Sequence, residues 1–75
     1  MSAEVKTRIA TIAAPYRREI WLDELRFESG MRLLRVTIKE GARFTQIDLD
    51  AETADRWAKI MLDWTGASSR DDPDV

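Results

Sequence analysis

The side chains best suited to chemistry are two pairs of carboxylates, Asp23 with Glu24 and Asp48 with Asp50. Successive residues of a strand point to opposite faces of a sheet, so Asp23 and Glu24 cannot converge on one substrate. Asp48 and Asp50 share a face and could hold a magnesium ion beside a phosphate. Asp50 is also placed to cap a helix, however, and this is the stronger interpretation. We therefore expect no metal site.

The residue types on which most enzymes rely are missing from the chain. Its 75 residues include no histidine and no cysteine. This removes the commonest general base near neutral pH and all thiolate chemistry. The serines have no histidine to activate them, and the sequence contains no glycine-rich phosphate loop. We expect a protein that is not an enzyme and that uses no cofactor.

Length and charge set the class of protein. A chain of 8.7 kDa forms one domain with a small core. No apolar run approaches the ~20 residues of a membrane span, and no secretory signal begins the chain, so we expect a soluble cytoplasmic protein with no membrane partner. Residues 17–43 carry seven basic and five acidic side chains, whereas residues 44–75 carry three basic and eight acidic ones. Such an uneven distribution of charge can favour one partner surface over another.

Three segments are predicted to be strands. Residues 18–28 are rich in β-forming types, and a bulge is expected near Asp23 and Glu24. Residues 31–40 and 43–49 alternate apolar and polar side chains, as half-buried strands do. Because short glycine-containing turns join the three segments, they predict an antiparallel meander.

A helix is predicted from Ala51 to Thr65, capped by Asp50 and ended by Gly66. At 100° per residue its apolar arc covers about 200°, which is wider than one docking surface requires. We expect this helix to contact two surfaces. The arc is made of Ala54, Trp57, Ala58, Ile60, Met61, Leu62 and Trp64.

The two ends of the chain are less strongly patterned. Residues 1–15 fit either a helical face or a strand, and their Thr and Ile content favours an extended segment. Residues 67–75 are acidic and predict a disordered tail. Between them, residues 16–66 form the domain proper. The expected fold is α+β: an antiparallel β-meander of three to four strands packed against one C-terminal α-helix.

One helix can cover only one face of such a sheet, which leaves an aromatic and basic face without cover. Exposed patches of this kind usually mark interaction surfaces. Three occupants are open: a second copy of the chain, single-stranded nucleic acid, or the N-terminal segment or another protein. The candidate partner face comprises Trp21, Phe27, Leu33, Arg35, Lys39, Arg43 and Phe44, and a candidate helix interface comprises Ile60, Leu62 and Trp64.

The sequence also bears two resemblances to known families. The stretch PYRREI…ESGMRLLRVTIKEGARFTQIDLDAETA, residues 15–54, resembles a small family of uncharacterised proteobacterial proteins, a domain of unknown function. That resemblance implies a bacterial, cytoplasmic protein. A curved antiparallel sheet is followed by a G-x-R-F…I-x-L-D turn into a tryptophan-containing helix, from Gly41 to Trp57. This layout is similar to the transcriptional coactivator p15/Whirly-like single-stranded DNA-binding fold. It implies that the sheet would face nucleic acid and that the helices would pair in a dimer.

The function expected from the sequence is therefore that of a small non-enzymatic interaction module that forms a homodimer. The alternative is a single-stranded DNA- or RNA-binding protein with a transcription-related role, which would use the aromatic and basic sheet face.

Overall fold

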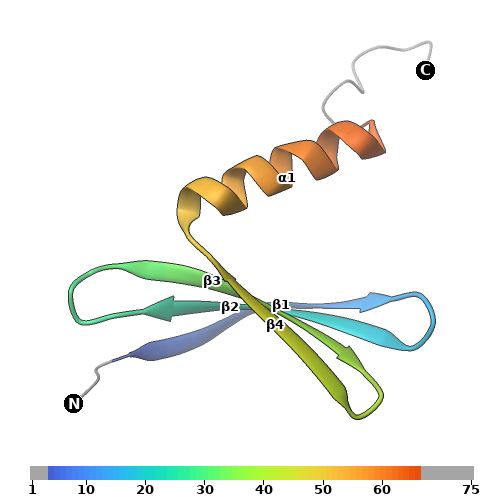
Figure 1. Cartoon of the computed structure of the whole chain (residues 1–75), viewed down its shortest axis with the longest axis horizontal. Coiled ribbons are helices and arrows are strands. Elements are labelled where there is room, and N and C mark those ends of the chain that lie inside the picture. Colours follow the sequence, from blue (N-terminus) through green and yellow to red (C-terminus); the bar gives the residue numbers. More distant parts are fainter. Residues whose placement is uncertain (1–3, 67–75) are drawn as a thin grey trace.

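Four strands and one helix make up residues 4–66, the part of the chain that this computed structural model describes. They follow one another along the chain as an antiparallel sheet in the order β1-β2-β3-β4, with the helix after the last strand (Figure 1). The elements are β1 (Val5–Ala14), β2 (Arg18–Arg26), β3 (Arg32–Glu40), β4 (Arg43–Leu49) and α1 (Ala51–Thr65).

The α+β meander predicted from the sequence is confirmed. The N-terminal segment, which was expected to be extended, supplies the fourth strand. The predicted disordered tail, residues 67–75, lies outside the described residues.

The strand register gives the sheet two different faces. On the first, Leu22 lies opposite Val36, and Val36 lies opposite Ile47. On the second, Trp21 and Thr37 are partners in the same ladder. The helix face comprises Ile12, Ile20, Leu22, Leu34, Val36, Ile38, Ile47 and Leu49. The far face includes Arg8, Trp21, Asp23, Leu25, Leu33, Arg35, Thr37, Lys39, Phe44 and Asp48.

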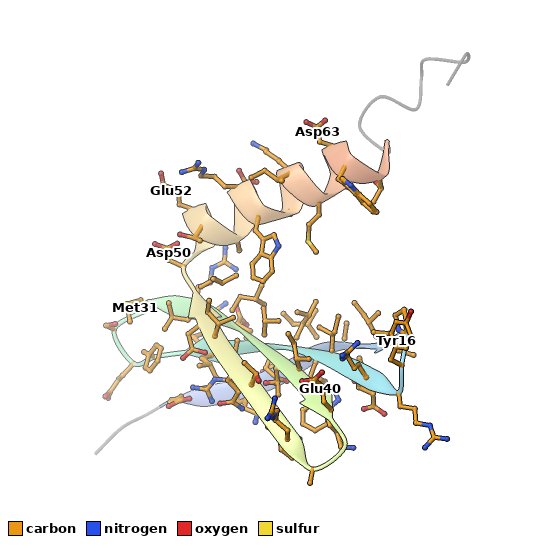
Figure 2. The ribbon with its side chains drawn as sticks, turned by 45° about the vertical axis from the view of Figure 1, so that its right-hand side comes forward. Tyr16, Met31, Glu40, Asp50, Glu52 and Asp63 are labelled. Atoms are coloured by element: carbon orange, nitrogen blue, oxygen red, sulfur yellow. The ribbon has the colours of Figure 1, made fainter. Side chains whose placement is uncertain are left out.

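Helix α1 lies over the helix face but stands away from it (Figures 1 and 2). Among the described residues its close contacts are with β3 and β4, and none of its own residues is buried. In residues 4–66 the buried hydrophobic side chains are Leu25, Val36 and Leu49. The helix and its sheet therefore leave much of their apolar surface uncovered.

Both ends of α1 are capped as the sequence predicts. The carboxylate of Asp50 accepts a hydrogen bond of 2.8 Å from the backbone N–H of Thr53. Gly66 ends the helix with a φ of +85°, in the left-handed region that glycine enters without a Cβ clash. Since β4 ends at Leu49, the cap residue alone joins strand to helix.

A β-bulge interrupts the first strand of the sheet. Arg8 lies opposite Asp23 and Ala10 lies opposite Leu22, which leaves Ile9 as an extra residue in β1. The bulge expected near Asp23 and Glu24 therefore occurs in the neighbouring strand. The predicted bulge was placed beside the correct residues of β2 but in the wrong strand. The alternation of side chains within β2 does not reveal how β1 is paired with it.

The turn between β1 and β2 holds two non-glycine residues in the left-handed region. Tyr16 has a φ of 64° and Arg17 a φ of 63°. For L-residues this conformation costs about 1–2 kcal/mol each. The tip presents an exposed tyrosine ring, over which the guanidinium of Arg18 lies 5.6 Å from the centroid.

Replacing Tyr16 and Arg17 together by Asn and Gly should raise the free energy of unfolding by about 1–2 kcal/mol, because Asn-Gly is the pair that such turns favour. Urea denaturation at one fixed protein concentration measures the change. The matched control places Ala at both positions, which removes the side chains and keeps the Cβ clash. An equal gain from Ala-Ala would contradict the backbone explanation.

Candidate functional site

An apolar groove runs between α1 and the helix face of the sheet. It has a volume of about 270 Å³. Trp57 and Met61 line it from the helix, and Leu22 and Val36 line it from the centre of the sheet. We call it the helix–sheet groove. Its full lining is Ile12, Ile20, Leu22, Leu34, Val36, Ile38, Leu49, Ala54, Trp57, Ala58 and Met61.

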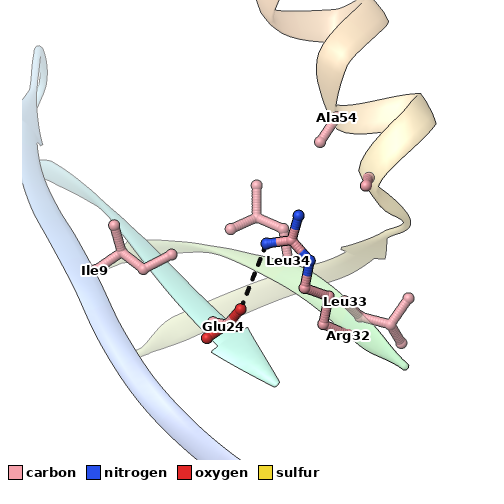
Figure 3. Close-up of a pocket in the computed structure, with 7 residues that line it drawn as sticks. Ile9, Glu24, Arg32, Leu33, Leu34 and Ala54 are labelled. Atoms are coloured by element: carbon pink, nitrogen blue, oxygen red, sulfur yellow. Dashed lines mark ion pairs between the residues drawn. The ribbon is translucent and has the colours of Figure 1, made fainter. Parts of the chain in front are cut away.

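A second opening of about 230 Å³ continues the groove toward the start of α1. The two openings share Leu34 and Ala54 as lining residues. Figure 3 shows Ile9 of β1 on one side of this opening and Ala54 of α1 on the other. Glu24 and Arg32 also line this opening and form an ion pair 3.5 Å long. The helix–sheet groove is therefore apolar along its main part, and its second opening contains one ion pair.

The far face is held together by two ion pairs at its centre. Arg35 donates two hydrogen bonds to Asp48, of 2.8 Å from Nε and 3.1 Å from a terminal nitrogen. Arg8 pairs with Asp23, whose side chain is only 1% exposed. A buried carboxylate needs such a partner, because an isolated buried charge would cost several kcal/mol.

An aromatic pair lies beside these ion pairs. The rings of Trp21 and Phe44 are 5.7 Å apart at an interplanar angle of 48°. The guanidinium of Arg8 lies 4.7 Å from the centroid of Trp21, within the range of a cation–π contact. The indole N–H of Trp21 donates a hydrogen bond of 2.9 Å to Glu19. One surface of the tryptophan is therefore already occupied by an arginine.

The structure brings together five of the seven residues predicted for the partner face: Trp21, Leu33, Arg35, Lys39 and Phe44. Arg43 lies on the opposite face, since it is the ladder partner of Glu40. Phe27 lies beyond the end of β2, where its backbone N–H donates to the carbonyl of Met31 over 2.8 Å. Arg43 differs because a single step along a strand reverses the face, and Phe27 differs because β2 ends one residue before it.

The predicted helix residues Ile60, Leu62 and Trp64 are 63%, 50% and 87% exposed. None of these three residues lines the groove. The helix residues that do line it are Ala54, Trp57, Ala58 and Met61.

Residues of the groove and of the far face that sequence reasoning missed are those defined by register. Ile12, Arg8 and Asp23 take their places only once β1 is paired with β2. The apolar residues Ile9 and Ile12 are a signal for this strand, but the bulge at Ile9 hides the alternation that a strand would show.

Three carboxylates titrate below their ordinary range because each accepts hydrogen bonds. The guanidinium of Arg35, through its hydrogen bonds and then its charge, lowers the pKa of Asp48. Arg18 lowers the pKa of Glu40 in the same two ways. Hydrogen bonds from Thr53 lower the pKa of Asp50. All three carboxylates are therefore ionised at neutral pH and engaged with protein groups.

The paired aspartates weighed as a metal site have other roles. Asp48 is bound to Arg35, and Asp50 caps α1. Within residues 4–66, no group of three or more acidic, histidine or cysteine side chains could hold a metal ion. No helix in that part of the chain is long and apolar enough to cross a membrane.

These features define a class: a small α+β protein with a four-stranded antiparallel meander, one splayed helix and an apolar trough between them. The chain belongs to the family of unknown function DUF6967, whose model matches residues 3–67. Comparison with curated proteins and with solved structures gives no match.

Changing Asp48 to Asn should make the protein less acid-sensitive. Because Arg35 lowers the pKa of Asp48 below the ~3.9 of an unfolded aspartate, the stabilisation is fully present above about pH 5. It is lost as the pH falls through the folded pKa. At pH 7 the variant should be less stable by at most about 1 kcal/mol, and the difference should shrink as the pH falls through the lowered pKa of Asp48. Urea unfolding between pH 2 and 7 tests this, with Glu28→Gln as the control; a constant difference at all pH values would contradict it.

Proposed function

We propose that this protein is a non-enzymatic interaction module that binds a second copy of itself through the helix–sheet groove. The observation that carries the proposal is incomplete burial on one side of the sheet. Leu25, Val36 and Leu49 are the buried hydrophobic side chains of residues 4–66, and α1 has none. Domains this small usually need disulfides, a metal or an oligomer to supplement the core. The chain has no cysteine for a disulfide.

The uncovered apolar area is comparable with what a dimer needs. Trp64 is 87% exposed, and Ile12, Ile47, Ile60, Met61 and Leu62 are each about half exposed. With 150–250 Å² for a tryptophan and less for aliphatic side chains, these residues leave on the order of 500 Å² per copy. A standard interface takes about 800 Å² from each partner, including its polar rim. A second copy thus fits the area available.

Binding of single-stranded nucleic acid through the far face is the alternative. Trp21 and Phe44 are suitable for base stacking, and Lys39 lies beside them. However, Arg35 and Arg8 are engaged with Asp48 and Asp23, and Arg8 occupies one surface of Trp21. Phosphate binding would have to break those ion pairs. The overall charge of −2 also opposes binding to a polyanion. The groove is therefore the better-supported site.

The native protein should sediment at twice its 8.7 kDa chain mass, and its melting temperature should rise with protein concentration. Met61→Lys should raise the dimer dissociation constant at least about tenfold, because it places a charge in the groove. Met31→Lys is the matched control: Met31 is 54% exposed against 55% for Met61, and it lies outside the groove lining. A monomeric native protein, or equal effects of both substitutions, would overturn the proposal.

Titration with a mixed-sequence single-stranded oligonucleotide should leave the tryptophan fluorescence unchanged at ~20 mM and ~200 mM salt, since the far-face arginines are engaged with carboxylates. Saturable quenching at the lower salt, lost at the higher salt and lost again in Arg35→Ala with Lys39→Ala, would favour the nucleic-acid alternative instead.

A further inference from the structure

We propose that the segment filling each groove is helix α1 of the second copy, so that the two copies insert their helices into one another. This inference rests on the proposed self-association. It adds which part of the partner makes the contact and which of its side chains enter the groove.

The walls of the groove determine what kind of segment can enter. Trp57 and Met61 form one wall from α1, and Ile20, Leu22 and Val36 form the other from the sheet. An occupant must therefore contact a helix on one side and a sheet on the other. It must also be elongated, because the second opening extends the trough past Leu34 and Ala54.

The same helix carries an apolar ridge that its own sheet does not use. Ile60 and Trp64 are four residues apart, so they are neighbours on one side of α1. At 100° per residue Trp64 lies about 20° and Ile60 about 60° around the helix axis from Trp57, and they lie about 60° and 100° from Met61; Trp57 and Met61 both line the groove. They are 63% and 87% exposed. The ridge therefore borders the part of α1 that lines the groove, and it stays exposed on the same copy.

Two-fold symmetry turns this arrangement into a closed dimer. In an isologous contact, the surface that one copy offers meets the complementary surface of the other, and the contact occurs twice. A ridge and a groove on the same chain satisfy that condition. The wide apolar arc of α1 would then be covered on both sides, by its own sheet and by the partner's sheet.

The charges around the groove are compatible with insertion. Arg18 pairs with Glu40 and Arg32 pairs with Glu24 on the sheet. On the helix, Lys59 pairs with Asp55 over 2.9 Å. Lys59 and Asp55 lie about 160° around the helix axis from Trp57, on the side of α1 away from the groove. Glu24 and Arg32 line the second opening but are paired with one another, so apolar side chains of the ridge would meet mainly apolar side chains of the groove.

Other modes of self-association use different surfaces, and the test must separate them. The outer edge of β1 is interrupted by the extra residue Ile9, which disfavours pairing with another strand. The outer edge of β4 and the far face around Phe44 are the other two surfaces available to a second copy.

Isotope-filtered nuclear Overhauser spectroscopy on a mixture of labelled and unlabelled native protein tests the inference without any substitution. We expect intermolecular contacts from the side chains of Ile60 and Trp64 to those of Ile20, Leu22 and Val36. Intermolecular contacts confined to β4, to the far face or to helix with helix would overturn it. Contacts confined to β4 or to the far face would also overturn the proposed groove contact, even if light scattering still reported a dimer. Contacts of Ile20, Leu22 and Val36 with a segment of the partner other than α1 would overturn only the present inference, and the proposed dimer through the groove would stand. A monomer would remove both.

Cross-linking provides a second readout, since the native chain has no cysteine. Ile60→Cys mixed with Ile20→Cys should give a covalent dimer with a short bis-maleimide. Ile60→Cys mixed with Phe44→Cys is the control, because Phe44 lies on the far face, and there the product should be lost. Equal yields from the two mixtures would overturn the inference.

Discussion

The width of the apolar helix face governs the rest of the structure. Its side chains come from all four strands, whereas α1 lies close to β3 and β4 only, among the described residues. A single helix of 15 residues covers part of such a surface and exposes its own apolar arc at the same time. The exposed apolar side chains of the sheet, the distance of α1 from it and the groove between them therefore have one cause: α1 is too small to cover the helix face.

The far face also has buried side chains, although no second layer formed by the described residues packs on it. Arg8 and Arg35 lie across it, each fixed by a carboxylate on a neighbouring strand. Long cationic side chains can cover apolar and polar groups with their stems while their heads stay hydrated. Asp23, Leu25 and Thr37 are each 1% exposed on this face. The cover is incomplete in one respect, because no described group hydrogen-bonds the buried Thr37 hydroxyl. The contrast between the two faces identifies the helix face as the one with room for a partner.

Most of the fold could be predicted from local patterns in the sequence. The alternation in residues 31–40 and 43–49 places β3 and β4 within one residue, and the capping residues place α1 at Ala51–Thr65. Strand β1 was harder to recognise, because the bulge at Ile9 interrupts its alternation and most of its residues are exposed. The candidate site was less accessible still. Whether Arg35 is available depends on Asp48 lying opposite it, and whether Trp57 is covered depends on how far α1 stands from the sheet. Both are properties of pairing and packing between elements, which no single segment encodes.

The junction between β4 and α1 carries a consequence for the length of the chain. Asp50, with φ −77° and ψ 171°, is the sole residue between the strand and the helix. Because this linker is a single residue, its length determines which side of α1 faces the sheet. Inserting one would turn α1 by about 100° and swing Trp57 and Met61 out of the groove. Homologous chains can thus vary in length at the hairpin turns, whereas insertions and deletions at this junction should be excluded.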